Sequence, residues 1–485
     1  MSVSVSSAAG WAGASQAGRT ALQFATTVIL ARLLAPGDYG LMAMALAIAA
    51  LGAVFRDLGT GTAIIQRTGL DDRLINGIFR LNLALGLALS ILCIAGAGPF
   101  AQLLGEPRLA AVLVLMSPIF LVSSVGVVPQ ALLERESRFK DLAGIELAAA
   151  ALAASVAVAA AALGLGLYAL VAQTLTTITA SSVLLFLRSR WRPRRGGSIS
   201  DVRPLLTFSS NLFTFNSLNY VHRNADAFLV GRFLGAVDLG FYSVGYKVVL
   251  FPLQNFTFVL ARVLLPAYSR QQSNPAEVSR HYLHSLGSIT FISAPLMALI
   301  WAVREPFVEA LLGPQWLRAA GVIAWLAPVG LLQSMVSTSG SVLSAFGRTD
   351  LLRNLGLAGV PMLVGSFAVG LPWGIEGVAA AYCAANLLWA YPVLSTVMRV
   401  IGTHHHAFLR AVWRPIAVAL VVAASARLAT TVVAGSGFGL APQLAAPAVV
   451  GMSVYILGCR LLRIGHLVSM SDMALRFAQQ LRKSS

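Results

Sequence analysis

The chain has 485 residues, of which 57% are hydrophobic and only 11% are charged. Soluble domains average roughly 25% charged residues, so this composition excludes a soluble globular protein. The formal net charge is +17. In a protein of this composition the basic residues are read first for the side of the membrane on which they lie, and we expect no nucleic-acid partner.

Apolar runs of about 20 residues recur along the whole chain, and each can cross about 30 Å of hydrocarbon as a helix. They predict an all-α polytopic membrane protein with about 14 transmembrane helices. The first six are 12–34, 41–64, 79–104, 109–132, 143–163 and 166–188. The next six are 205–234, 239–265, 283–303, 320–345, 353–373 and 376–398, and the last two are 411–433 and 442–463. Beyond them, apolar residues at helical spacing between Leu467 and Leu481 predict an amphipathic helix on the membrane surface.

An internal repeat relates the two halves of the chain. Arg32, Leu34, Asp38 and Gly40 recur 200 positions later as Arg232, Leu234, Asp238 and Gly240. Arg348 follows the tenth helix as Arg138 follows the fourth, and Gly374 precedes the twelfth helix as Gly166 precedes the sixth. Six helices per half bring both halves into the membrane from the same side, so the axis relating them runs along the membrane normal. We therefore predict an N-lobe at 1–200, a C-lobe at 201–402, and two further helices with the tail at 403–485. This organisation is typical of a transporter.

Basic residues collect on alternate links between the predicted helices. The links on one side include Arg67 to Arg80, Arg135 to Lys140, Arg188 to Arg203 and Arg399 to Arg414. The other links hold only scattered arginines. The positive-inside rule then places both termini in the cytoplasm. The cluster around Arg188–Arg195 is interpreted as an inner-leaflet anchor, and Trp191, Trp413, Trp316 and Trp373 as interfacial anchors.

The stretch LLAPGDYGLMAMALAI, followed by FRDLGTGTAIIQR, resembles the polysaccharide-transporter branch of the multidrug/oligosaccharidyl-lipid/polysaccharide flippase superfamily. The resemblance is to Wzx-type oligosaccharide flippases of the colanic-acid-exporter kind. It extends over essentially the full chain, with its most specific parts at 33–41, 55–67 and 231–246. It implies a bacterial inner-membrane protein whose two six-helix lobes enclose a central cavity. It also implies alternating access that moves undecaprenyl-pyrophosphate-linked oligosaccharides to the periplasmic leaflet.

Ionisable and polar residues inside predicted spans are the candidate site, because such groups are costly in lipid and usually face a wet cavity. Polar residues share one face of the first helix and one face of the seventh, and the resemblance adds weight to this match. The predicted pyrophosphate ligands are Arg19, Arg56, Arg223 and Lys247. The predicted sugar ligands are Gln23, Asn216, Asn219 and Gln254.

The same residues have a structural alternative. Arg56 could pair with Asp57 and Arg223 with Asp226, while Arg19 and Lys247 extend to an interface. The two carboxylates are also candidates for H⁺ or Na⁺ coupling, against a simple role in charge balance.

Other functions have weaker support in the sequence. A multidrug extruder is the nearest alternative, because aromatics crowd the seventh and eighth helices. A glycan polymerase or acyltransferase is disfavoured, because no nucleophile, base and orienting group come together, and we expect no enzymatic activity. Neither His404–His406 nor the isolated cysteines Cys93, Cys383 and Cys459 predict a metal site or a resident cofactor. We expect a functional monomer in contact with membrane lipids, with a polysaccharide polymerase or export complex as a candidate partner.

Overall fold

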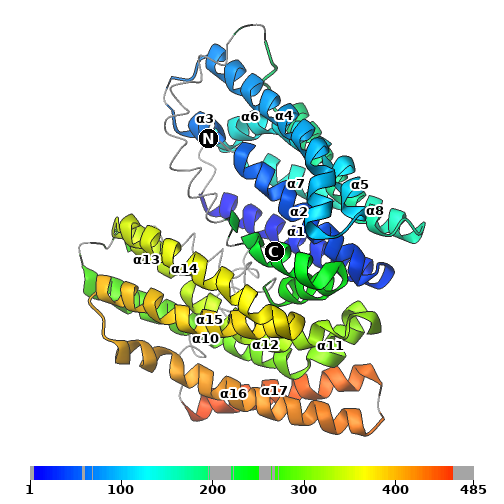
Figure 1. The fold of residues 1–485 in the computed structure, drawn as a ribbon. Helices are drawn as coiled ribbons and strands as arrows, with labels where there is room; N and C mark the ends of the chain where they lie inside the picture. Colours follow the sequence, from blue (N-terminus) through cyan, green and yellow to red (C-terminus); the bar gives the residue numbers. More distant parts are fainter. Residues whose placement is uncertain are drawn as a thin grey trace, which may run out of the picture. The chain divides into compact units, whose positions relative to one another are not determined.

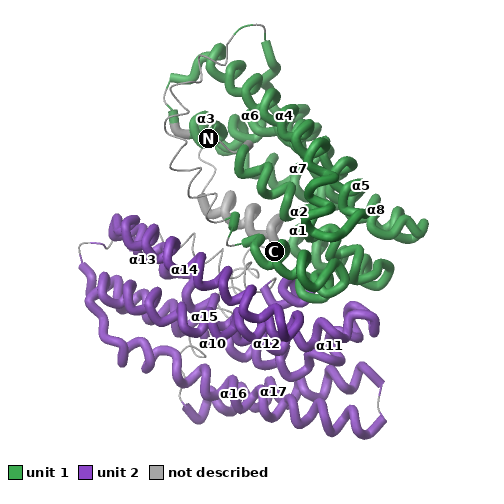
Figure 2. The backbone as a smooth tube through the Cα atoms, viewed as in Figure 1, with its two compact units in different colours: residues 1–243 green, residues 244–485 purple. Residues whose placement is uncertain are grey.

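The computed structural model describes residues 5–462 except 57–59, 68, 195, 197–219, 222, 251–263, 265–267, 271, 273 and 438. For 5–17, 56 and 66 it describes the backbone alone. Over the described residues the chain is helical and contains no β-strand. It packs into two compact units, residues 1–243 and 244–485 (Figures 1 and 2). The lobes predicted from the repeat divide the chain by sequence rather than by packing, and that division stays a prediction.

Unit 1 contains eight labelled helices and the beginning of a further helical run. The helices are α1 (Val5–Leu33), α2 (Pro36–Arg56), α3 (Thr60–Gln66), α4 (Asp72–Leu104), α5 (Arg108–Met116), α6 (Pro118–Arg135), α7 (Phe139–Ala162) and α8 (Leu167–Arg188). The helical run Arg223–Leu250 crosses from unit 1 into unit 2. Gly235 inside it has φ +85°, a left-handed conformation that a continuous straight helix does not contain. The turn falls in the link predicted between the seventh and eighth helices.

Unit 2 continues the helical architecture. Its labelled elements are α10 (Pro275–Ala302), α11 (Arg304–Leu312), η1 (Pro314–Trp316), α12 (Ala319–Val336), α13 (Ser339–Ala345), α14 (Thr349–Gly370), η2 (Leu371–Trp373), α15 (Gly374–Val400), α16 (His405–Gly435) and α17 (Leu440–Leu461). A buried cluster that includes Tyr282, Leu286 and Val397 forms part of its core. The predicted amphipathic tail lies outside the described residues.

Eleven helical runs among the described residues are long and apolar enough to cross a membrane. One of them, Thr349–Val400, is 52 residues long and contains both α14 and α15, which were predicted as two spans. Another, Arg223–Leu250, covers parts of two predicted spans. With α1 added, the arrangement is consistent with about 14 spans. The predicted all-α polytopic fold is confirmed.

The repeat is visible in local backbone geometry. Arg138 caps α7 with φ −83° and ψ 49°, and Arg348 caps α14 with φ −85° and ψ 53°. Gly166, which precedes α8, and Gly374, the first residue of α15, have φ +52° and +70°. Side chains rarely adopt these values, so glycine is required at both positions. The equivalent turns in the two halves therefore both use a glycine with positive φ.

A symmetric glycine contact joins the two copies of the repeated motif within unit 1. A Cβ added at Gly40 would lie 1.7 Å from the carbonyl oxygen of Ala236. A Cβ added at Gly240 would lie 1.9 Å from the carbonyl oxygen of Pro36. Because neither glycine has a side chain, each copy of the motif can lie directly against the backbone of the other copy. The pattern that revealed the repeat in sequence is also a packing device.

One aromatic was assigned wrongly from the sequence. Trp316, expected at the membrane interface, is fully buried in unit 2. It is the last residue of the 3₁₀ turn η1 between α11 and α12, and its ring packs inside the unit instead of reaching an interface. Trp373, by contrast, is 72% exposed, as an interfacial anchor requires.

Candidate functional site

Arg19 is held in place by an acidic partner on another helix of unit 1. Its Nη1 donates to Oε2 of Glu146 at 2.6 Å, and this contact joins α1 to α7. The side chains are 34% and 50% exposed, so the pair lies at an accessible surface of the unit. Gln23, one turn along α1, is exposed. The predicted polar face of α1 therefore presents an oriented guanidinium beside an amide.

The described residues of the second polar helix differ in the exposure of their side chains. Arg223 is exposed, whereas Asp226 is half-buried and its Oδ1 accepts the Ala227 backbone N–H at 2.8 Å. In the described part of the chain no ion pair links Arg223 to Asp226. Tyr220, just before this run, donates to the Ala47 carbonyl at 3.1 Å and so attaches this part of the chain to α2. The local pairing that was the structural alternative for Arg223 is thus not present between these residues.

In unit 2, Lys247 has an exposed side chain although Val248, Val249 and Leu250 directly after it are buried. Tyr246, the residue before it, lies against Tyr382 with ring centroids 6.5 Å apart. Tyr382 is only 3% exposed, so this ring contact belongs to the interior of unit 2, whereas Lys247 lies at its surface.

Polar and aromatic groups surround Tyr382 inside unit 2. Gln333 Nε2 donates to the Tyr382 hydroxyl at 3.0 Å and to Asn386 Oδ1 at 3.4 Å. Phe367 stacks on Tyr382 with ring centroids 4.9 Å apart. Phe367 and Tyr382 are each 3% exposed and Asn386 is 9% exposed, so these contacts form a polar and aromatic cluster inside unit 2, with Gln333 as its half-buried member.

Several predicted site residues cannot be placed. Arg56 is the last residue of α2, but its side chain lies outside the described structure. The remaining predicted ligands fall outside the described residues. They are Asp57, Asn216, Asn219 and Gln254.

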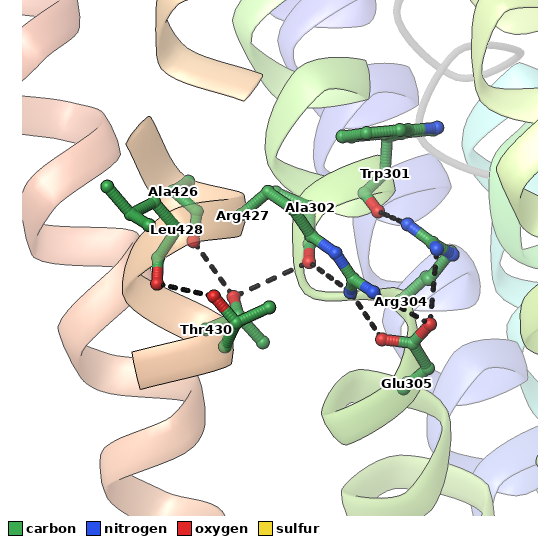
Figure 3. A network of polar contacts seen from close by, with 9 residues as sticks. Trp301, Ala302, Arg304, Glu305, Ala426, Arg427, Leu428 and Thr430 are labelled. Atoms are coloured by element: carbon green, nitrogen blue, oxygen red, sulfur yellow. Dashed lines mark hydrogen bonds and ion pairs between the residues drawn. The ribbon is translucent and has the colours of Figure 1, made fainter. Parts of the chain in front are cut away.

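A three-residue charge cluster lies at one end of unit 2. Arg304 Nη2 lies 3.1 Å from Glu305 Oε1, and Arg427 on α16 contacts both carboxylate oxygens of Glu305. Figure 3 shows the two guanidinium groups converging on this carboxylate from different elements. Arg427 Nη1 and Thr430 Oγ1 also donate to the Ala302 carbonyl near the end of α10, each at 3.4 Å. The cluster fastens α16, a helix outside the repeat, to α10 and α11.

Two of these charged residues were missed at the sequence level. Glu146 lies inside the predicted span 143–163, and Arg427 inside 411–433. Both positions carry the signal that identified Arg19, an ionisable group within an apolar run. The sequence does not single them out, because neither belongs to the matching polar faces of the first and seventh helices.

The histidine run does not form a metal site with other described residues. His404 and His406 stack with ring centroids 5.8 Å apart and an interplanar angle of 17°. Where the structure describes the chain, no group of three His, Cys, Asp or Glu side chains could hold a metal ion.

The fold and the charged helix faces define a class of protein: a many-spanning membrane transporter built from two related halves. Residues 29–321 match the family described as "Polysaccharide biosynthesis protein", and the chain belongs to that family. The resemblance identified in the sequence is thereby confirmed.

Known relatives and solved structures agree with this assignment. The lipopolysaccharide biosynthesis protein WzxC of Escherichia coli (strain K12) is 24% identical over 80% of each chain. The teichuronic acid biosynthesis protein TuaB of Bacillus subtilis (strain 168) is 25% identical over 71% of this chain and 70% of its own. The lipid II flippase MurJ, in an inward closed conformation, has the same fold, with a TM-score of 0.74 and 16% identity over 93% of this chain and 98% of its own. An inward-facing multidrug transporter of the MATE family also matches, with a TM-score of 0.62 and 16% identity over 79% of this chain and 94% of its own.

Proposed function

We propose that this chain is a flippase of the bacterial inner membrane. It carries undecaprenyl-pyrophosphate-linked oligosaccharides from the cytoplasmic to the periplasmic leaflet by alternating access, with both termini in the cytoplasm. The observation that carries the proposal is a two-repeat transporter fold in a chain whose family is concerned with polysaccharide synthesis. A transporter serves that synthesis by moving its lipid-linked intermediates.

The task requires recognition of a charged head group without breaking any bond. Arginine matches phosphate oxygens with a planar fork, and lysine supplies a point charge. The proposed pyrophosphate ligands are Arg19, Arg56, Arg223 and Lys247. Arg19 is oriented by Glu146 yet remains partly exposed, so its other donors can face a ligand. Arg223 and Lys247 are exposed cations on a membrane-spanning helical run, which supports the same role.

The sugars are proposed to bind polar groups near these cations. The residues assigned from sequence are Gln23, Asn216, Asn219 and Gln254. To these we add Gln333, which is half-buried and connected to Tyr382 and Asn386 in unit 2. Hydroxyl groups of a glycan can exchange hydrogen bonds with such amides.

The glycine contact between the two repeats is proposed as the closed outer gate. Gly40 and Gly240 lie at the ends of their helices that the charge pattern places outside. Alternating access requires this contact to open. Gly37 and Val237 offer a test, because a Cβ at position 37 would lie 3.4 Å from Val237 Cγ2. In a background lacking the native cysteines, an oxidised Gly37→Cys/Val237→Cys cross-link should stop transport until it is reduced. Undiminished transport with the cross-link complete would refute the gate.

Energy coupling is proposed to use a carboxylate at membrane depth, Asp57 or Asp226, with H⁺ or Na⁺ as the coupling ion. Asp226 is half-buried and has no ion pair with Arg223, which supports a role other than neutralising that neighbour. Transport that resists both a protonophore and removal of Na⁺ would exclude coupling. We propose that the chain works as a monomer alongside the polymerase or export machinery that consumes its product.

The functional test is complementation of a strain in which the gene is deleted. The wild-type chain should restore the polysaccharide and clear accumulated lipid-linked oligosaccharide. Arg223→Ala should fail at normal expression, because it removes an exposed cation without leaving an unpaired partner at Asp226. Full complementation by Arg223→Ala would remove this residue from the site.

A multidrug extruder is the second candidate, favoured by the MATE-like fold and by the partly exposed ring of Tyr246. Organic cations bind aromatic faces. The two functions separate in the deletion strain. Loss of polysaccharide with unchanged drug susceptibility supports the flippase, and hypersensitivity to cationic drugs with intact polysaccharide supports the extruder.

A further inference from the structure

Unit 1 contains an open groove between α4, α6 and α8 with a volume of about 820 Å³. Its walls are formed by apolar side chains spaced one turn apart on each helix: Leu83 and Leu87, Leu121 and Val125, Val183 and Leu187. Leu87 and Leu187 are 49% and 63% exposed, so the groove opens to the surroundings of the unit. Such walls suit a hydrocarbon chain rather than an aqueous solute.

Two arginines lie at one end of the apolar groove. Arg80 lines it eight residues after the start of α4, and Phe186 lines it two residues before the end of α8. Arg192 lies over the Phe186 ring, with its Cζ 4.7 Å from the centroid. Since consecutive spans alternate in direction, the start of α4 and the end of α8 are on the same membrane side, so both guanidinium groups mark one end.

The second guanidinium is held in position by the backbone. Arg192 Nη1 donates to the carbonyls of Phe186, Ser189 and Trp191 at 2.7–2.8 Å. These contacts use Nη1, and they leave Nε and Nη2 of the fork as further donors. Trp191 itself packs edge-on against Phe79, with ring centroids 5.3 Å apart. Aromatic rings beside fixed cations are typical of the head-group level of a membrane.

The length of the groove fits one leaflet. Arg80 and Leu87 are separated by seven residues of helix, or about 10 Å along its axis. One leaflet contributes about 15 Å of the roughly 30 Å hydrocarbon core. The groove therefore begins with charge at the interface and ends within the same leaflet, as the chains of a resident lipid do.

We propose that the α4–α6–α8 groove binds an anionic glycerophospholipid of the cytoplasmic leaflet, with its phosphate between Arg80 and Arg192 and an acyl chain along the apolar walls. Basic pockets between transmembrane helices on the cytoplasmic side bind anionic head groups in this way. The leaflet assignment rests on the orientation given under the proposed function. The site itself is distinct from the cations proposed to hold the oligosaccharide carrier.

The test is lipid retention by the purified full-length chain in nanodiscs that contain equal phosphatidylglycerol and phosphatidylcholine, measured by native mass spectrometry. The wild type should retain phosphatidylglycerol in several-fold excess. Arg80→Gln should abolish this preference, and Val183→Trp, which fills the groove from a 50% exposed position, should reduce retention of both lipids. Arg353→Gln, an exposed arginine in unit 2, is the matched control and should behave as wild type.

Equal retention of the two lipids by the wild type, or a preference that survives both groove variants, would overturn the proposal. Displacement of the lipid by undecaprenyl phosphate but not by excess phosphatidylglycerol would also overturn it, and would assign the groove to the carrier. Competition by free glycerol phosphate alone would reduce the site to a phosphate site and contradict the acyl-chain part. The lipid-retention assay contains no oligosaccharide, so a negative result there does not contradict the flippase proposal. A failed flipping assay, in turn, does not contradict lipid binding in the groove.

Discussion

Replacing Arg19 distinguishes a residue that binds substrate from one that only holds α1 against α7. The Arg19–Glu146 pair is 2.6 Å long, but both side chains are substantially exposed. Partly exposed pairs contribute about 0.2–1 kcal/mol, so Arg19→Met should lower the stability of the chain only slightly. A hydrogen bond to a charged ligand contributes about 1.5–3 kcal/mol. Loss of such a bond corresponds to roughly a 10- to 100-fold fall in transport.

A charge reversal separates the two roles further. In Arg19→Glu/Glu146→Arg the ion pair is rebuilt but the cation moves from α1 to α7. Thermal stability should return to that of the wild type, while transport of lipid-linked oligosaccharide into the outer leaflet of proteoliposomes should stay low. Arg280→Met, which removes a looser pair with Glu277 at 3.9 Å in which the arginine is 75% exposed, is the control and should change neither quantity. Recovery of full transport by the reversed pair would refute substrate binding by Arg19, because only the pairing would then matter.

The packing gives three stability predictions, of which the two glycine substitutions are measured by thermal denaturation of the detergent-solubilised chain and the third by limited proteolysis. Gly40→Ala should destabilise the fold by about 1–3 kcal/mol or more, because its Cβ would meet a carbonyl oxygen at 1.7 Å. Gly365→Ala, with open space around the Cβ, is the control and should not destabilise it. Equal stability of the two variants would contradict the close contact at Gly40. Gly374 has φ +70° and ψ −163°, a region that is essentially restricted to glycine, so Gly374→Ala should cost about 1–3 kcal/mol, and an unchanged midpoint would show that the turn can relax. Glu305→Gln removes the carboxylate shared by the guanidinium groups of Arg304 and Arg427, so it should loosen α16 and speed proteolysis of the 435–440 link. Unchanged proteolysis would show that this charge cluster does not hold α16 in place.

The fold was largely predictable because its signals are local. Apolar runs of membrane-spanning length set the number of spans, and repeated glycines marked the places where the chain reverses. Gly166 and Gly374 could be matched in sequence because each has a backbone conformation that other residues avoid. Trp316 was misplaced because burial depends on how a short 3₁₀ turn folds against its neighbours, and hydropathy carries no information about that.

The site was only partly predictable, for a physical reason. Helical spacing places polar residues on a face, so Arg19 and Gln23 could be grouped, but it does not name the partner on another helix. Glu146 is 127 positions away in sequence, and its contact with Arg19 arises only from the packing of α1 against α7. Gln333, Tyr382 and Asn386 were missed for the same reason, because two separate helices bring them together.

The most direct test of the central claim is a flipping assay with the purified chain in sealed proteoliposomes. Fluorescent undecaprenyl-pyrophosphate-linked oligosaccharide is placed in the inner leaflet, and its arrival in the outer leaflet is followed with a membrane-impermeant glycosidase. The wild type should bring the glycan into reach of the enzyme far faster than empty liposomes, and Arg223→Ala should not. Access that stays at the rate of empty liposomes, with H⁺ and Na⁺ gradients imposed in either direction, would contradict the account.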